Sequence, residues 1–221
     1  ALLDRLELPA NPLILEAGCG TGGNLGMLER RGHVSAFEPF DEATDSARDR
    51  HPRADVRIGR LPDDLPFAEA SFDLVAALDV LEHCDDDSAS LAALVRLVKP
   101  GGAVVVTVPA HQRLWGSHDR RLHHRRRYGR AELRRLATDA GADIEFETAF
   151  NTVLAPIAVV YRLMENLVGI ELGNQERMPT PIVNRILGGL FGLERQWIAR
   201  AAVPFGLSYG FILRRPLVEA S

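Results

Sequence analysis

The sequence predicts an α/β protein built on a doubly wound, mostly parallel β-sheet. Short apolar runs alternate along the chain with segments of helical hydrophobic spacing, an order typical of parallel sheets with helices on both faces. The β-branched run at 103–108 has no polar face, as expected of a strand that is buried on both sides. Of the 221 residues, 46% are hydrophobic and 25% are charged, a balance typical of a globular domain with a sizeable core.

Seven strands and four main helices follow from this pattern. In chain order, the expected strands lie at 13–15, 33–37, 56–59, 72–78, 103–108, 143–150 and 208–214. The expected helices lie at 23–31, 42–50, 86–98 and 130–140. Lys99-Pro100-Gly101-Gly102 is expected to stop the third helix, because proline and glycine are common directly after a helix end.

Residues 151–204 interrupt the alternation of strands and helices. They contain several prolines and glycines and three amphipathic pieces, at 153–168, 181–191 and 194–202. We expect a single domain over 1–221, in which this segment is a helical cap inserted before the last strand, near the sheet edge where ligands bind. Its apolar faces leave several alternatives open: packing on its own domain, lining an apolar ligand pocket, or contacting a second copy or a membrane surface.

The charge and cysteine content of the chain disfavour several classes of protein. The net charge of −4 argues against a general nucleic-acid binder. The two cysteines, Cys19 and Cys84, have no paired spacing, which favours a reducing compartment without disulfides or a zinc–cysteine site. No apolar run is long enough to span a bilayer, and no signal-peptide pattern is present. We expect a cytoplasmic protein without a transmembrane segment, either a monomer or a homodimer.

A glycine-rich loop follows the first expected strand. Residues 13–22 read Leu-Ile-Leu-Glu-Ala-Gly-Cys-Gly-Thr-Gly, so Gly-x-Gly-x-Gly follows an acidic residue and leads into a helix. Glycines allow the backbone to approach a ligand closely, and the N–H groups at a helix start can bind it. Proteins that bind NAD or FAD also use glycine-rich loops, but with the spacing Gly-x-Gly-x-x-Gly. An NAD-dependent oxidoreductase is therefore the weaker alternative.

The loop resembles motif I of the class I S-adenosylmethionine (SAM)-dependent methyltransferases, of the bacterial methyltransferase domain 11, 12 and 23 type. Further segments match that family in the same order, at Glu38, 59–61, 65–67, 71–75, 78–83 and 99–102. The resemblance covers about residues 11–150 and the last strand. It implies a Rossmann-like seven-stranded sheet whose last strand is antiparallel. It also implies SAM as the cofactor and S-adenosylhomocysteine as its product.

The resemblance implies a role for each matching residue. Gly18 and Gly20 would hold the methionine end of SAM, Glu16 would orient it, and Glu38 would accept hydrogen bonds from the ribose hydroxyls. The complete set of implied cofactor residues is Glu16, Gly18, Cys19, Gly20, Thr21, Gly22, Glu38, Pro39, Phe40, Arg60, Leu61, Leu78, Asp79, Val80 and His83. Arg60 departs from the family pattern, in which an acidic residue often reads the adenine amino group.

Two clusters are candidates for the side of the site that holds the methyl acceptor. The first is Asp79-x-x-Glu82-His83, where His83 is a candidate base. We expect no metal there because the donor set is thin, but a metal held by these three residues stays an alternative. The second is the basic segment 111–128 after the fifth strand, whose arginines suit carboxylate or phosphate groups. The expected catalytic residues are His124, His111, His83, Arg126, Arg127 and Tyr128. A plain solvated loop is the simpler interpretation of the arginines.

The sequence therefore predicts a SAM-dependent methyltransferase that methylates oxygen on a small or modified acceptor. The acceptor is expected to carry a carboxylate or phosphate and to be partly apolar; small-molecule, lipid-like and peptide acceptors all fit, and peripheral membrane contact stays an alternative. A nucleic-acid acceptor is disfavoured, because residues 78–81 do not form an Asn/Asp-Pro-Pro-Tyr motif. A SAM-binding protein without transferase activity is an alternative that only a turnover measurement excludes.

Overall fold

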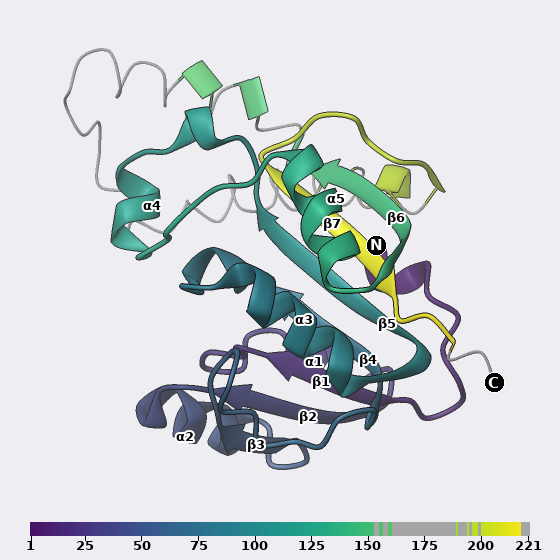
Figure 1. Cartoon of the computed structure of the whole chain (residues 1–221). Helices are drawn as coiled ribbons and strands as arrows, with labels where there is room; N and C mark the ends of the chain where they lie inside the picture. Colours follow the sequence, from purple (N-terminus) through teal and green to yellow (C-terminus); the bar gives the residue numbers. More distant parts are fainter. Residues whose placement is uncertain are drawn as a thin grey trace.

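The computed structural model describes residues 1–152, 155–156, 159–160, 189, 194, 196–198 and 200–217. A seven-stranded sheet forms its centre (Figure 1). Its strands are β1 (Leu13–Ala17), β2 (His33–Glu38), β3 (Asp55–Ile58), β4 (Phe72–Leu78), β5 (Val98–Pro109), β6 (Asp143–Phe150) and β7 (Ser208–Arg214). Their order in the sheet is β3-β2-β1-β4-β5-β7-β6, and only β7 runs antiparallel to its neighbours. The expected fold class is confirmed.

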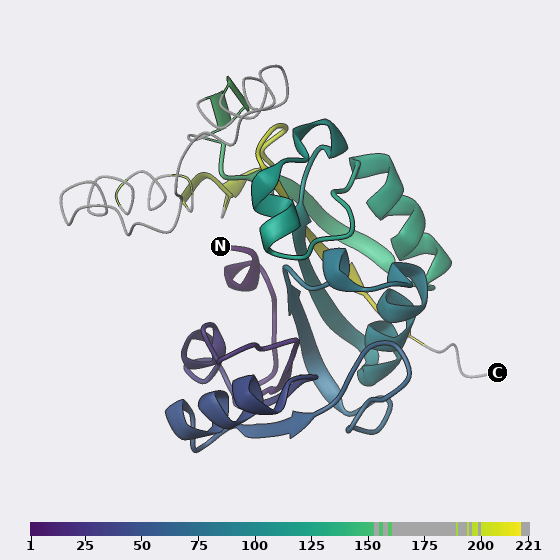
Figure 2. The ribbon, with the colours of Figure 1, turned by 90° about the vertical axis from the view of Figure 1, so that its left-hand side faces the viewer.

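Helices cover both faces of the sheet (Figure 2). The α-helices are α1 (Leu25–Leu28), α2 (Asp41–Arg50), α3 (Asp87–Leu97), α4 (Ser117–Arg121) and α5 (Arg130–Asp139). Three short 3₁₀ helices are η1 (Leu2–Asp4), η2 (Leu81–His83) and η3 (Gln112–Leu114). Strand side chains alternate between two cores: Leu15 and Val75 pack with α3 and α5, whereas Ile14 and Leu74 pack with η1, α1 and α2.

Two element boundaries differ from the expected ones: the start of the helix after the glycine loop and the start of β5. The helix expected at 23–31 covers only Leu25–Leu28, because Gly20 and Gly22 hold positive φ angles and the chain turns before it can become helical. The helix α3 begins after Asp86, whose carboxylate accepts the Ala89 N–H at 2.8 Å. The helix ends at Leu97, and β5 begins directly at Val98, before the expected start of this strand at residue 103. Gly101, within this early part of β5, has a φ angle of +78°.

Most of the expected cap at 151–204 lies outside the described residues, so its packing over the sheet stays a prediction. Within the described part, Trp197 is exposed, whereas Ile198 and Glu194 are buried. The Glu194 carboxylate accepts the Thr152 N–H at 2.6 Å, which joins this segment to the end of β6. Among the helices that the structure describes, none combines the length and apolar character needed to cross a membrane.

Candidate active site

Two cavities adjoin at the carboxyl ends of the central strands. The larger, of about 550 Å³, is lined by Gly18, Gly20, Phe37, Glu38, Pro39, Phe40, Arg60, Leu61, Asp79, Val80, His83, Cys84, Asp85, Leu122, His123 and Arg125. The smaller, of about 300 Å³, is lined by Asp79, Glu82, Pro109, Leu114, His118, Leu122, His124, Arg127, Leu207 and Ser208. Because Asp79 and Leu122 line both cavities, two ligands bound there would lie side by side.

The glycine loop forms one wall of the larger cavity. Gly18 and Gly20 have φ angles of +64° and +52°, a backbone conformation that residues other than glycine rarely adopt. A Cβ atom on Gly18 would lie 3.0 Å from a methyl group of Val80, so the loop packs closely against the chain that leaves β4. The Gly20 N–H donates to the Glu38 carboxylate at 3.0 Å. The loop and the end of β2 therefore hold each other in place.

Glu38 ends β2, and its side chain is buried at the edge of the larger cavity. It is followed by Pro39 and Phe40, and the Phe40 side chain is 66% exposed at the cavity rim. Arg60 and Leu61 reach the same cavity from the loop after β3. A carboxylate next to an exposed aromatic ring suits a ligand that carries hydroxyl groups beside a flat apolar ring.

Glu16 lies behind the glycine loop. It is buried, Asn24 donates to its Oε1 at 3.0 Å, and its Oε2 has no hydrogen-bond partner among the described residues. Burial raises the pKa of Glu16 to about 7, against the lowering effect of the Asn24 hydrogen bond. Like Glu16, four other expected cofactor residues are absent from the described lining of the larger cavity: Cys19, Thr21, Gly22 and Leu78.

Asp79 stands at the boundary between the two cavities. Its φ angle is +57°, and its backbone N–H donates to the Thr107 carbonyl at 3.0 Å. The Thr107 hydroxyl donates to Asp79 Oδ1 at 3.2 Å. Burial raises the pKa of Asp79, although the Thr107 hydrogen bond and the nearby His124 act in the opposite direction. A carboxyl group thus lies at the point where two reactants would meet.

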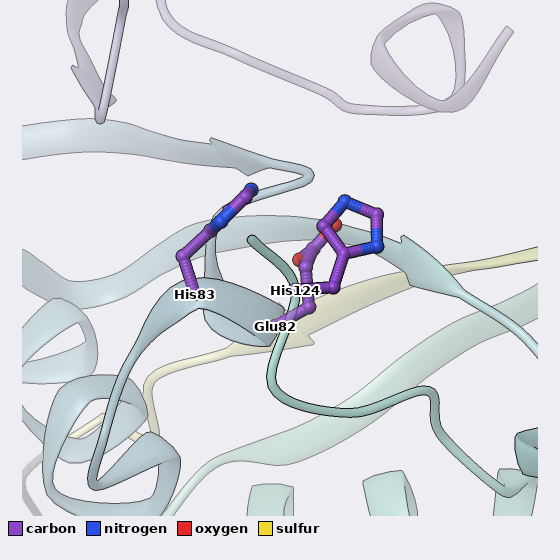
Figure 3. Close-up of side chains that lie close together, drawn as sticks. All are labelled: Glu82, His83 and His124. Carbon is purple, nitrogen blue, oxygen red and sulfur yellow. The ribbon is translucent and has the colours of Figure 1, made fainter. Parts of the chain in front are cut away.

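Glu82 and two histidines gather beside this boundary (Figure 3). Glu82 is fully buried, and neither of its carboxylate oxygens has a hydrogen-bond partner among the described residues. Burial and the charge of Asp79 raise the pKa of Glu82 to about 8. The rings of His83 and His124 meet edge to face, with centroids 4.9 Å apart. Burial and His124 lower the pKa of His83. Sequence reasoning weighed Glu82 as a metal ligand beside His83 and Asp79 and left that question open.

Asp119 belongs to the basic segment that the sequence singled out, but sequence reasoning gave it no role. Its fully buried carboxylate accepts His124 Nδ1 at 3.0 Å, Arg127 Nε at 2.8 Å and the Gly116 N–H at 2.9 Å. Although burial alone would raise its pKa, these partners lower the pKa of Asp119 to about 2. The carboxylate therefore fixes the His124 ring and leaves its Nε2 for other partners. The available signal was a single acidic residue within a run of basic ones.

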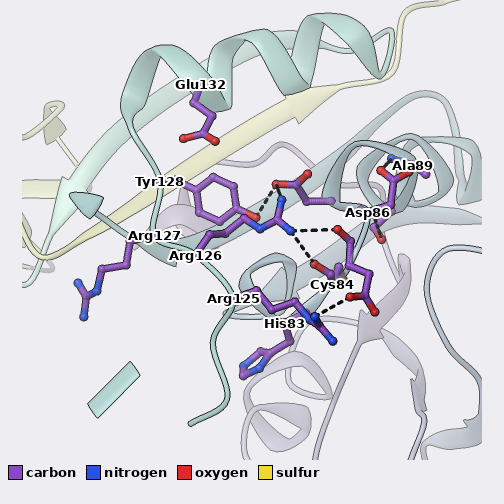
Figure 4. Close-up of polar contacts among 12 residues, drawn as sticks. His83, Cys84, Asp86, Ala89, Arg125, Arg126, Arg127, Tyr128 and Glu132 are labelled. Atoms are coloured by element: carbon purple, nitrogen blue, oxygen red, sulfur yellow. Dashed lines mark hydrogen bonds and ion pairs between the residues drawn. The ribbon is translucent and has the colours of Figure 1, made fainter. Parts of the chain in front are cut away.

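Arg126 and Tyr128 are absent from the described lining of both cavities and instead make polar contacts near the start of α3 (Figure 4). Arg126 forms an ion pair with Asp87 at 3.0 Å and donates to the carbonyl oxygens of Cys84 and Asp85 at 3.2 and 2.9 Å. The buried Tyr128 hydroxyl donates to the same Asp87 carboxylate at 2.9 Å. Their contacts join the basic segment to the start of α3. These positions favour a structural role, and a catalytic role stays a prediction that the geometry does not support.

His111 is also absent from the described lining of the two cavities. Its ring stacks on Phe205 with centroids 5.2 Å apart and meets the edge of Tyr209 at 5.4 Å. Its Nε2 is buried and has no hydrogen-bond partner among the described residues, and burial lowers the pKa of the ring. Of the six expected catalytic residues, His83, His124 and Arg127 line a cavity, whereas His111, Arg126 and Tyr128 do not appear in the described lining.

Comparison with known proteins shows a similarity to methyltransferases. A family model described as "Methyltransferase domain" matches residues 15–106. A protein of Mycolicibacterium smegmatis named "Probable S-adenosylmethionine-dependent methyltransferase" is 34% identical over 135 residues, which are 60% of this chain and 52% of that protein. Residues 15–106 therefore resemble a methyltransferase domain, and SAM is the cofactor named for the Mycolicibacterium relative. The chain spans about half the length of the Mycolicibacterium relative.

One further relative and one solved structure are also similar to this chain. The malonyl-[acyl-carrier protein] O-methyltransferase of Enterobacter lignolyticus is 29% identical over 177 residues, covering 77% of this chain and 68% of that protein. The structure of Haemonchus contortus phosphoethanolamine N-methyltransferase 2 in complex with SAM superposes with a TM-score of 0.65 and 17% identity, over 97% of this chain and 51% of that chain. At this identity the structural likeness concerns the fold alone.

Proposed function

We propose that this chain transfers the methyl group of SAM to an oxygen atom of a small or modified acceptor. The observation that carries the proposal is the boundary at Asp79, where the cavity with the expected cofactor residues meets a second cavity lined by carboxyl and imidazole groups. Methyl transfer requires two ligands in contact, and positioning them is the main contribution of the enzyme. The likeness to a named O-methyltransferase supports oxygen as the methylated atom.

The proposal places SAM in the larger cavity. The Glu38 carboxylate would accept the ribose hydroxyls, because a carboxylate has lone pairs for both. Phe40 and Leu61 would contact the adenine, and the backbone of Gly18 and Gly20 would hold the methionine end. This arrangement directs the sulfonium and its methyl group toward Asp79, at the boundary between the two cavities.

The reaction itself is an in-line displacement. An acceptor oxygen attacks the methyl carbon, an O–C bond forms, and the S–C bond breaks with its electron pair left on sulfur, which gives S-adenosylhomocysteine. If the acceptor is a hydroxyl, its proton would pass to Nε2 of His124, because Asp119 holds Nδ1 of the same ring at 3.0 Å. His124 would be the base and Asp119 the residue that positions it.

The lining of the smaller cavity favours a neutral hydroxyl over the carboxylate or phosphate acceptor that the sequence suggested. Arg127 lines this cavity, but its Nε is paired with buried Asp119 at 2.8 Å and its Nη1 donates to the Ala110 carbonyl at 3.1 Å. Asp79 and Glu82 contribute two carboxyl groups to the same lining. An anionic acceptor would lie next to both of them.

An acceptor panel tests the proposal. The purified chain is incubated with SAM and with phenols, aliphatic alcohols, carboxylic acids and amines, and S-adenosylhomocysteine and methylated products are measured by mass spectrometry. We expect O-methylation of a hydroxyl compound, and in His124→Gln a loss of kcat of about 10²- to 10⁴-fold with unchanged SAM affinity. Methylation of amines alone would contradict the proposal. SAM binding without turnover on any class would favour a binding protein that lacks transferase activity.

A further inference from the structure

Three side chains with metal-ligating atoms, from two separate parts of the chain, meet where the two cavities adjoin: Glu82 and His124 line the smaller cavity and His83 lines the larger one. Glu82 and His83 lie in η2 directly after β4, and His124 lies between α4 and α5. A carboxylate oxygen of Glu82 and one ring nitrogen from each histidine lie within 4.8 Å of one another (Figure 3). We propose that Glu82, His83 and His124 bind a divalent first-row transition-metal ion of the zinc class.

The environment of Glu82 supports a cation at this point. The carboxyl group is fully buried, and both of its oxygens lack a hydrogen-bond partner among the described residues. A buried carboxyl group without partners is costly, and proteins normally balance it with a paired cation or a metal. The charged neighbour Arg127 is already engaged with Asp119. A bound metal ion would therefore satisfy the carboxyl group of Glu82, which has no partner among the described residues.

The two histidines are prepared to act as ligands. A metal-binding histidine usually donates its second ring N–H to a carboxylate, which orients the ring and makes its free nitrogen more basic. Asp119 provides this contact, since its Oδ1 lies 3.0 Å from Nδ1 of His124. His83 meets the His124 ring edge to face.

The donor set and its geometry indicate the class of ion. Two imidazoles and one carboxylate are a ligand set of catalytic zinc sites, which keep a fourth position open for water or substrate. Bonds of about 2.0–2.1 Å in a tetrahedral site place ligand atoms about 3.4 Å apart. The present separations extend to 4.8 Å, so the side chains must close by up to about 1.4 Å. The open position would face the cavity that Asp79 and Ser208 also line.

A metal ion here would change how the proposed reaction is assisted. A hydroxyl bound to the ion loses its proton more readily than a free one, so the ion would take over the task assigned to His124 when that nitrogen is a ligand. Metal binding is measured without SAM and without an acceptor. Failure of the metal site is therefore distinguishable from failure of the proposed O-methylation.

The test is a titration of the full chain, freed of metal by a chelator that is then removed. Zn²⁺ binding is followed by calorimetry and Co²⁺ binding by visible absorption, which reports tetrahedral coordination. We expect one ion per chain. Because Asp119 positions a ligand, Asp119→Asn should weaken Zn²⁺ binding by about 10- to 100-fold, and Glu82→Gln and His124→Gln should weaken it further.

His123→Gln is the matched control, because His123 neighbours His124 in the chain and is absent from the cluster that the described residues form. We expect this variant to bind Zn²⁺ like the unmodified chain. Circular dichroism verifies that every variant is folded, and Asp119→Asn replaces any ligand variant that is not. Absence of Zn²⁺ binding, binding that survives both Glu82→Gln and His124→Gln, or equal weakening by His123→Gln would each overturn the inference.

Discussion

Three buried carboxyl groups of this chain behave differently because their partners differ. Asp119 accepts hydrogen bonds from His124, Arg127 and a backbone N–H, and its pKa falls to about 2. Glu82 has no hydrogen-bond partner among the described residues, and burial raises its pKa to about 8. Glu16 has one partner, Asn24, and burial raises its pKa to about 7. Partners rather than depth decide which carboxyl group keeps its charge.

Glu16 allows a prediction about stability and pH. Its pKa rises from 4.5 to about 7 in the folded chain, so between these values the folded state holds a proton that the unfolded chain has released. Stability should therefore fall as the pH rises through this window, by up to roughly 3 kcal/mol from this group alone. Glu16→Gln should remove that contribution.

The measurement is urea unfolding of the chain and of Glu16→Gln at about pH 5 and about pH 8, without ligand. Other titrating groups affect both proteins equally, so the difference between the two pH dependences isolates Glu16. A variant whose free energy of unfolding changes with pH as much as that of the unmodified chain would show that Glu16 does not hold the proton.

Site residues that belong to a local sequence pattern were predicted, whereas the roles of those that depend on contacts between distant segments were not. Gly18, Gly20 and Glu38 were found because a short local pattern carries them, and the structure brings all three to one cavity. The roles of Asp119 and Glu82 depend on contacts with segments distant in the sequence, such as Glu82 with His124. No local pattern reports such contacts. Within the basic segment, neighbouring arginines also differ: Arg127 lines the smaller cavity, whereas Arg126 is absent from the described lining and donates to the Asp85 carbonyl.

At the scale of elements, the segment before α5 is tied to the start of α3. The Tyr128 hydroxyl and the Arg126 guanidinium share the Asp87 carboxylate, at 2.9 and 3.0 Å. This tie places the loop that carries His124 and Arg127 against η2. The sequence predicted both helices, but it could not show that these side chains connect them instead of facing the acceptor.

Removing the hydrogen bond between Tyr128 and Asp87 tests whether Tyr128 has a structural or a catalytic role. Tyr128→Phe removes one buried hydrogen bond to a charged group, so it should destabilise the chain by about 1.5–3 kcal/mol. SAM affinity and turnover should stay within about twofold, since the ring still fills its site. Thermal unfolding and methyl-transfer rates measure the two effects. Loss of turnover without loss of stability would instead assign Tyr128 to the chemistry.

Helix and strand boundaries show where local pattern is sufficient. The strand ends at β4, β6 and β7 match the expected ranges, because alternation or apolar runs define them on both sides. The helix after the glycine loop is shorter than expected, since the positive φ angles of Gly20 and Gly22 delay its start until Leu25. The loop conformation thus delays the helix although the hydrophobic spacing is helical from residue 23, and the sequence alone does not show the length of this delay.

At the scale of the whole molecule, the sheet order places the two cavities. The order in which strands are added to the sheet reverses between the parallel strands β1 and β4: β2 and β3 follow on one side of β1, and β4 and β5 on the other. Ligands of doubly wound sheets bind at such a point. The glycine loop after β1, Glu38 at the end of β2 and Asp79 after β4 converge there. Strand–helix alternation predicted this convergence, because parallel strands share one carboxyl edge. The contribution of residues 151–204 to the acceptor side stays a prediction, since most of them lie outside the described part of the chain.

The most direct test of this account is calorimetric titration of the purified chain with SAM, S-adenosylhomocysteine and NAD. We expect one molecule of either adenosyl ligand to bind per chain and NAD not to bind. Glu38→Ala should weaken SAM binding by about tenfold or more, because charge-assisted hydrogen bonds to the ribose are lost. His124→Gln, which lies across the boundary, should bind SAM normally. Binding of NAD in place of SAM, or SAM binding that is unchanged in Glu38→Ala, would contradict the account.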